Sequence, residues 1–224
     1  AKKFNISRED QDKFALNSQK KTQTAISNNK FYEELIKINQ DGNILDKDEH
    51  IRHGLKLTDL EKLKAVFIEN GTVTPGNSSG INDGAAALLL TTSEEAEKKS
   101  IKPLAQIVSW ASVGVDPSVM GLGPIEAVRN AVSKAKWNID EIDLFEINEA
   151  FAAQSIAVIR ELNIDQNKVN VNGGAISLGH PIGASGARIL VTLIHEMKRQ
   201  NKNKGCATLC IGGGMGIALC VERN

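Results

Sequence analysis

The pattern of hydrophobic and polar positions divides the chain into a polar first part and a second part, from residue 104, in which strand-like and helix-like segments alternate. Residues 10–27 are mostly polar, and Ser7 followed by Asp10 is close to the capping box that opens many helices. This stretch is therefore expected to be a surface helix. Residues 31–48 are expected to be extended and charged, with a turn at Asp41-Gly42.

Between residues 57 and 102 the pattern predicts short elements joined by a loop. A helical pattern covers residues 57–67, and residues 72–80 are rich in Ser, Thr, Gly and Pro, which is typical of a loop. The continuous apolar run at 85–90 is typical of a buried strand. Thr92, three residues before Glu95, predicts the start of a further helix.

From residue 104 the segments alternate regularly. Helices are predicted at 124–136, 149–162 and 181–199, the last with apolar residues three and four apart. Strands are predicted at 104–113, 144–147, 169–171, 207–211 and 217–221, the last two joined by a glycine-rich turn. Strands separated by helices of this length indicate an α/β fold.

Composition narrows the classes of function. Lysine plus arginine and aspartate plus glutamate both total 27, and aromatic residues make up 4% of the 224 residues. A chain without net charge and with few aromatic residues favours neither nucleic acid nor an anionic membrane as a partner. The three cysteines all lie between residues 206 and 220, which is a poor disulfide framework and fits a reducing, cytoplasmic location.

Three polar clusters directly follow predicted strands, at 148–151, 173–183 and 210–216. Because functional sites in α/β sheets gather at the carboxyl ends of strands, we expect these clusters to converge. His180 is either a helix-start histidine bonded to the backbone or a base. Cys210 is either a core residue or a tuned thiol, and Asn148 either caps a helix or orients a substrate oxygen. Cys206 and Cys220 are expected to be core residues.

Other common sites are not indicated. The glycines at 212–216 lack the spacing of a dinucleotide fingerprint and the Gly-Lys-Ser/Thr of a P-loop. His50 and His53 are three residues apart, but no carboxylate or cysteine cluster completes a metal site there. The sequence therefore predicts neither a metal nor a cofactor.

Taken together, the motifs resemble those of the thiolase family, in the family's order and spacing and over the whole chain. The matching motifs are ISREDQD at 6–12, DEHIRHG at 48–54, GNSSGINDGA at 76–85, NEAF at 148–151, GHPIG at 179–183 and CIGGGMG at 210–216. The resemblance implies a layered αβαβα fold with two similar halves and an inserted loop domain. It implies that residues 1–80 are part of the CoA-binding loop domain. Residues 81–102 would be the last strand and helix of the first half, and residues 103–224 the complete second half.

The resemblance also implies a reaction, the Claisen condensation of two acetyl-CoA molecules or its reverse, with CoA thioesters as substrates. In the family a cysteine of the first half accepts the acyl group. The histidine matching His180 activates that cysteine, and the cysteine matching Cys210 moves the α-proton. Asn148, through a water, and the backbone N–H of Gly212 would help to stabilise oxyanions.

Four further positions match the family's CoA and substrate contacts: Arg52, Phe67, Ser79 and Phe151. Proline and serine at 75 and 78 depart from the small residues common in relatives, which affects the expected shape of the pantetheine tunnel. None of the three cysteines matches the acyl-accepting position. This chain alone is therefore expected to be inactive and to belong with an N-terminal half, as a separate chain or as the rest of the same chain, in a homotetramer.

Three alternatives remain open. The glycine-rich motif at 210–216 and the short loop segment favour the acetoacetyl-CoA branch over a 3-ketoacyl-CoA thiolase of broader chain length. The missing nucleophile would also suit a non-catalytic CoA-binding partner chain. A cysteine hydrolase that uses Cys210 with His180 is the third possibility.

Overall fold

The computed structural model describes residues 1–223, and Asn224 lies outside the description. The described chain divides into two compact units, and each unit combines two separate stretches. The first unit contains Ala1–Asp83 and Ile147–Ile182, and the second contains Gly84–Glu146 and Gly183–Asn224. Among the residues described, no helix is both long and apolar enough to cross a bilayer.

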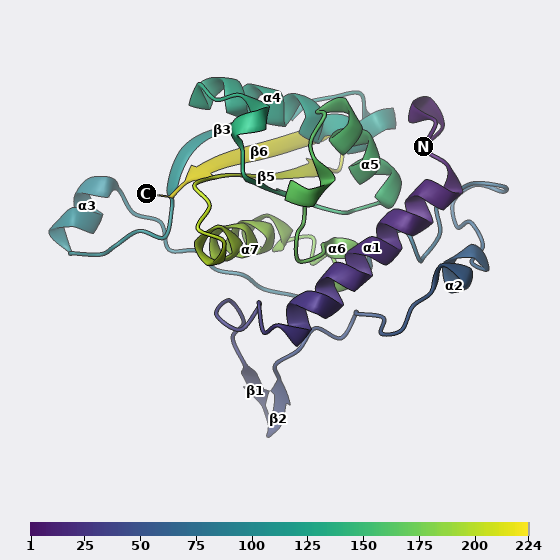
Figure 1. Cartoon of the computed structure of the whole chain (residues 1–224), viewed down its shortest axis with the longest axis horizontal. Helices are drawn as coiled ribbons and strands as arrows, with labels where there is room; N and C mark the ends of the chain where they lie inside the picture. The colour runs from purple at the N-terminus through teal and green to yellow at the C-terminus, as the bar shows by residue number, and fades with distance from the viewer. Residues whose placement is uncertain (224) are drawn as a thin grey trace. The chain divides into compact units, whose positions relative to one another are not determined.

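Helix α1 (Arg8–Ser27) is the longest element of the first unit (Figure 1). Its start is the capping box that the sequence predicts. The Asp10 backbone N–H donates to Ser7 Oγ at 3.0 Å, and the Ser7 N–H donates to Asp10 Oδ2 at 3.1 Å. Two backbone donors that would otherwise be unpaired are thereby satisfied, which fixes where the helix begins.

The other elements of the first unit are short. Helices α5 and α6 lie against α1 (Figure 1), and a small core joins them through Ala15, Ala152 and Ile176. The hairpin turns at Asp41 and Gly42, both with positive φ, as predicted. The bounds are η1 Lys2–Phe4, β1 Ile38–Gln40, β2 Asn43–Leu45, α2 Leu57–Glu61, α5 Ala152–Glu161, η4 Gln166–Lys168 and α6 Ala175–Leu178.

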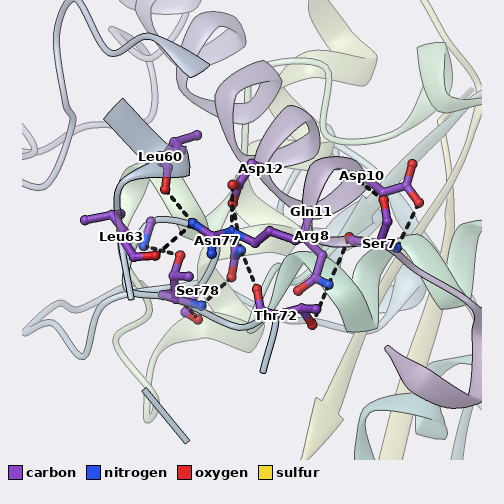
Figure 2. Close-up of polar contacts among 12 residues, drawn as sticks. Ser7, Arg8, Asp10, Gln11, Asp12, Leu60, Leu63, Thr72, Asn77 and Ser78 are labelled. Carbon is purple, nitrogen blue, oxygen red and sulfur yellow. Dashed lines mark hydrogen bonds and ion pairs between the residues drawn. The ribbon is translucent and has the colours of Figure 1, made fainter. Parts of the chain in front are cut away.

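A buried polar network fastens the loop at 72–79 to α1, as Figure 2 shows. Asp12 is 1% exposed; one of its oxygens accepts from Arg8 Nε at 2.7 Å and the other from Asn77 Nδ2 at 2.8 Å. The Arg8 guanidinium also donates to the carbonyls of Leu60 and Leu63. Because these carbonyls are bonded to Arg8, α2 has ended by Glu61 rather than at the predicted residue 67.

The second unit is built on a four-stranded sheet in the order β3-β6-β5-β4. Strands β3 and β5 are both antiparallel to β6. The α/β class and most elements are as predicted. The bounds are α3 Ser93–Lys98, β3 Gln106–Gly114, η2 Pro117–Leu122, α4 Gly123–Ala135, η3 Ile139–Glu141, β4 Leu144–Ile147, α7 Ser185–Arg199, β5 Lys204–Ile211 and β6 Met215–Glu222.

Helices α4 and α7 lie on opposite faces of this sheet (Figure 1). The residues of β5 show why a helix can pack on each face, because successive side chains along a strand point to opposite faces of the sheet. A side chain at Gly205 would run into Leu193 and Met197 of α7. Cys206, the next residue, is directly opposite Cys220 of β6, which pairs with Ser109. The Ser109 hydroxyl donates to the carbonyl of Ala131 in α4.

Two predicted strands are wrong. Residues 85–90 form no strand among the described residues, and Leu89 and Leu90 are 89% and 70% exposed. An apolar run becomes a strand only where a neighbouring strand pairs with it. Residues 169–171 also form no strand, because Asn170 has a φ of 43° and leaves the extended region.

Two helix starts were also predicted too early. Helix α5 begins at Ala152 with Phe151 as its N-cap, so Asn148 and Glu149 precede the helix and do not open it. The reason is that the Glu149 carboxylate is turned into the interior and bonded there. Helix α7 begins at Ser185 rather than 181.

Candidate active site

Asn148 and His180 lie together in the first unit. The side-chain nitrogen Nδ2 of Asn148 is 3.3 Å from Nε2 of His180. Asn148 directly follows β4 and is 1% exposed, and its Oδ1 is buried without a hydrogen-bond partner among the described residues. An unpaired buried oxygen is costly, so this amide is suited to hold a polar group brought to the site.

The backbone around His180 is fixed by neighbouring residues. Gly179 precedes it with a φ of 101°, a conformation that residues with a side chain rarely adopt. The His180 N–H donates to Asn82 Oδ1 at 3.2 Å, and His180 forms a parallel bridge with Ile81. The half-buried imidazole is therefore presented in one orientation beside Asn148.

Two expected substrate contacts, Ser79 and Phe151, are joined through Ala150, which precedes Phe151 in the chain. The N–H and the hydroxyl of Ser79 both donate to the Ala150 carbonyl at 3.1 Å. Phe151 packs edge to face against Phe67, with ring centroids 6.0 Å apart. Phe67 remains 69% exposed, so much of its ring is available to a ligand.

Arg52 has a fixed backbone and a partly exposed side chain. Its N–H donates to Gln19 Oε1 at 3.0 Å, and its carbonyl accepts from Gln23 at 2.9 Å. The guanidinium reaches the Pro75 carbonyl at 3.5 Å. Burial, and to a lesser degree the charge of Arg52, lowers the pKa of His50.

The second unit carries Cys210 and Gly212. Cys210 lies near the end of β5 and is half-buried. Burial raises the pKa of its thiol, and a backbone hydrogen bond partly opposes this. Gly212 opens the hairpin turn, is exposed, and has no atom within 4 Å of the position of a Cβ. Its backbone is thus open to close approach by a ligand.

The remaining cysteines are core residues, as predicted. Cys206 and Cys220 are fully buried and face each other across β5 and β6. The hydrogen bond with Cys220, and after it burial, hold the pKa of Cys206 well above the usual range. Within residues 1–223, no group of three or more His, Cys, Asp or Glu side chains is arranged to hold a metal ion.

Of the sequence-predicted residues, Asn148 is brought to His180, and Ser79 and Phe67 to the segment at 150–151. Cys210 and Gly212 belong to the other compact unit, and their convergence with His180 stays a prediction. Sequence reasoning placed Asn82 and Glu149 in matching motifs but gave neither side chain a role in the site. An acidic residue inside the largely apolar stretch 144–159 was the available signal for Glu149.

Comparisons with known protein families agree with the motifs. The model described as "Thiolase, C-terminal domain" matches residues 101–223. The model described as "Thiolase, N-terminal domain" matches residues 1–94. The first of these covers more than half of the chain.

Similar curated proteins are named acetyl-CoA acetyltransferase. One from Rhizobium meliloti (strain 1021) is 56% identical over all of this chain and 58% of its own length. A cytosolic one from Rattus norvegicus is 52% identical, with the same coverage. The chain thus spans less than two thirds of the length of the relatives that it matches.

Similar solved structures include the Bacillus anthracis acetyl-CoA acetyltransferase, with a TM-score of 0.95 and 47% identity over 99% of this chain and 57% of that one. Human mitochondrial 3-ketoacyl-CoA thiolase in complex with CoA has a TM-score of 0.94 and 41% identity over 100% and 57%. The predicted thiolase-like α/β fold is thereby confirmed. With two family models matched in sequence order and the Asn148–His180 pair formed, the chain belongs to the thiolase family.

Proposed function

We propose that this chain is the C-terminal part of an acetyl-CoA C-acetyltransferase. The reaction is the condensation of two acetyl-CoA molecules to acetoacetyl-CoA and CoA, and its reverse, thiolysis. The observation that carries the proposal is the contact of Asn148 with His180 at 3.3 Å on a fixed backbone. The names of relatives that are 52–56% identical support the choice of acetyl groups.

The chemistry needs a nucleophile, a base and a place for negative charge. A cysteine outside these 224 residues attacks the thioester after His180 takes its proton, and the leaving CoA thiolate takes the thiol proton of Cys210. The Cys210 thiolate then removes the α-proton of a second acetyl-CoA, the resulting enolate attacks the acyl-enzyme, and the released cysteine thiolate regains its proton from His180. Burial raises the pKa of Cys210, so its thiolate is a stronger base than that of an exposed cysteine.

Two sets of donors stabilise the oxygens that become negative. His180, with a water held by Asn148, serves the enolate oxygen, and the Gly212 N–H helps to serve the tetrahedral oxyanion. The buried, unpaired Oδ1 of Asn148 supports the first role, and the open surroundings of Gly212 support the second. Each such donor is typically worth about 3 kcal/mol.

Four residues are proposed to bind CoA and its acyl arm. Arg52 attracts the phosphates of the nucleotide, and its fixed backbone reduces the entropy lost on binding. Phe67 offers an exposed ring face to the adenine. Ser79 lines the pantetheine arm, and Phe151, in contact with Phe67, lies near the thioester. No cofactor is required besides the CoA thioesters.

A thiolase of broader chain length is the second candidate, because the human 3-ketoacyl-CoA thiolase is also structurally close at a TM-score of 0.94. A non-catalytic CoA-binding chain is a third, but simple binding does not require the buried Asn148–His180 contact. We also propose a cytoplasmic location, which the cytosolic rat and mouse relatives support. We further propose that the chain, together with an N-terminal half, forms a homotetramer.

Thiolysis of acetoacetyl-CoA by the complete protein tests the function, with His180→Ala as the inactive comparison. Faster cleavage of a long-chain 3-ketoacyl-CoA than of acetoacetyl-CoA would favour the second candidate. Absence of any thiolysis together with CoA binding would favour the third. Residues 1–224 expressed alone should show no turnover, since none of their cysteines matches the acyl-accepting position.

A further inference from the structure

Glu149 is a buried acid next to Asn148 that has no role in the proposed chemistry. It is 1% exposed, and its carboxylate accepts three hydrogen bonds. The donors are the Ser18 hydroxyl at 2.7 Å, the Asn170 side-chain amide at 2.9 Å and the Ile176 backbone N–H at 3.2 Å. A buried carboxylate is costly without such donors, so this set is what allows the acid to lie inside.

Through Asn170, Glu149 fixes the segment that carries Asn148. The Ile147 N–H donates to Asn170 Oδ1 at 2.8 Å, and Asn170 Nδ2 donates to the Ile147 carbonyl at 2.8 Å. Both backbone groups of the residue before Asn148 are therefore held by one amide, which Glu149 in turn orients.

Through Ile176, the same carboxylate fixes the segment that carries His180. Ile176 lies in the first turn of α6 (Ala175–Leu178), which ends two residues before His180. The Glu149 oxygen that accepts from Ile176 also accepts from Ser18 of α1. One side chain thus connects both segments whose side chains meet at 3.3 Å.

The space around this carboxylate is shaped by Gly174. A Cβ at position 174 would lie 2.3 Å from Glu149 Cδ, and the Gly174 N–H donates to Ser18 Oγ at 3.1 Å. Any larger residue at 174 would displace the carboxylate. The surroundings therefore fit a side chain of this length that accepts hydrogen bonds at both oxygens.

We propose that Glu149 is a positioning residue that sets the geometry of Asn148 and His180 and acts on the reaction only through Asn148 and His180. The inference rests on the proposed function, since the geometry matters only if these two side chains work on a thioester. A change at Glu149 is therefore expected to lower kcat and to leave CoA binding nearly unchanged.

The variant Glu149→Gln tests this with nearly unchanged volume. An amide can present only one oxygen, so its NH₂ would face a donor, most directly the Asn170 amide. The misplacement of Asn148 should lower kcat about ten- to a hundredfold while KM stays within about twofold. The control is Glu196→Gln, which changes a buried glutamate of α7 paired with Arg199. It should leave kcat unchanged.

A double-mutant cycle in the complete protein provides the decisive readout. In an Asn148→Ala background, Glu149→Gln should cause a smaller further loss of kcat than in the wild type, because the part of its effect that passes through Asn148 is already removed and only the part through His180 remains. If Glu149→Gln does not fold, Ser18→Ala replaces it; this removes the shortest donor and should give a smaller loss with the same non-additivity.

The outcomes separate the two proposals. A wild-type protein without thiolysis would overturn the proposed function and this inference with it. An active wild type in which the losses from positions 148 and 149 multiply, or in which KM rather than kcat changes, would overturn the inference alone.

Discussion

At the scale of single residues, burial is the main cause of the pKa shifts of Cys210 and His50. Cys210 has its pKa raised because its thiolate would lose contact with water, and His50 has its pKa lowered because burial disfavours its cation. Burial favours the uncharged form in both cases, although the shifts have opposite signs.

Alkylation of Cys210 should reflect this shift. In residues 1–224, the iodoacetamide rate at Cys210 should rise with pH with a midpoint above that of the same chain unfolded in urea, since only the thiolate reacts. Mass spectrometry of the labelled peptide measures it, and Cys210→Ser identifies the signal. If the pH midpoint of the folded chain were at or below that of the unfolded chain, the fold would stabilise the Cys210 thiolate, which would contradict the prediction.

His50 should make the fold sensitive to mild acid. Its folded pKa lies below the unfolded one, so its contribution is complete above the unfolded value of about 6.5 and is lost as the pH falls through the folded value. The urea midpoint should therefore fall less between pH 7.5 and 5 in His50→Gln than in wild type. The exposed His53, changed to Gln, is the control. An equal fall in wild type and His50→Gln would contradict the prediction.

At the scale of elements, α1 carries two acid–base pairs of the same i, i+4 spacing in different surroundings. Arg8 with Asp12 is part of the buried network of Figure 2, with Asp12 almost fully covered. Glu9 with Lys13 is exposed, at 68% and 60% of the side-chain surface. The first pair fastens the loop at 72–79, and the second lies on the exposed surface of the helix.

Asp12→Ala should therefore destabilise the fold by about 3 kcal/mol, because Arg8 and Asn77 lose a buried partner. Lys13→Ala, the matched control, should leave the unfolding midpoint unchanged within error, as expected of an exposed pair. Chemical denaturation of both variants measures the difference. Similar losses would mean that the buried network contributes no more than the exposed pair.

Several elements could be predicted from the sequence because their signals are local. Ser7 with Asp10, the Asp41-Gly42 turn and the glycines after Cys210 each act within a few residues. The interior position of Glu149 could not, because its partners Ser18 and Asn170 are 131 and 21 residues away. For the same reason residues 85–90 were misjudged, since an apolar run does not say whether a strand lies beside it.

At the scale of the whole molecule, the second unit exposes many large apolar side chains. They include Leu88, Leu89, Leu90, Ile101, Leu104, Ile107 and Trp110. Exposed apolar groups of this size favour association, since contact with another molecule removes them from water. Association is therefore expected of a polypeptide that consists of residues 1–224 alone.

That polypeptide should self-associate with increasing concentration, and Leu89→Lys should shift the association to higher concentrations. Thr91→Lys adds the same charge two residues away at another exposed position and should have a smaller effect. Light scattering coupled to size-exclusion chromatography measures both. A monomer at all concentrations, or equal effects of the two lysines, would contradict the prediction.

The missing Cβ at Gly174 has a consequence for how this sequence can change over generations. Positions 149 and 174 share one volume. A descendant that acquires alanine at 174 should survive only where residue 149 has already become shorter, because the added methyl group needs the space that the longer acid fills. Substitutions at this pair should therefore be inherited together, in a fixed order.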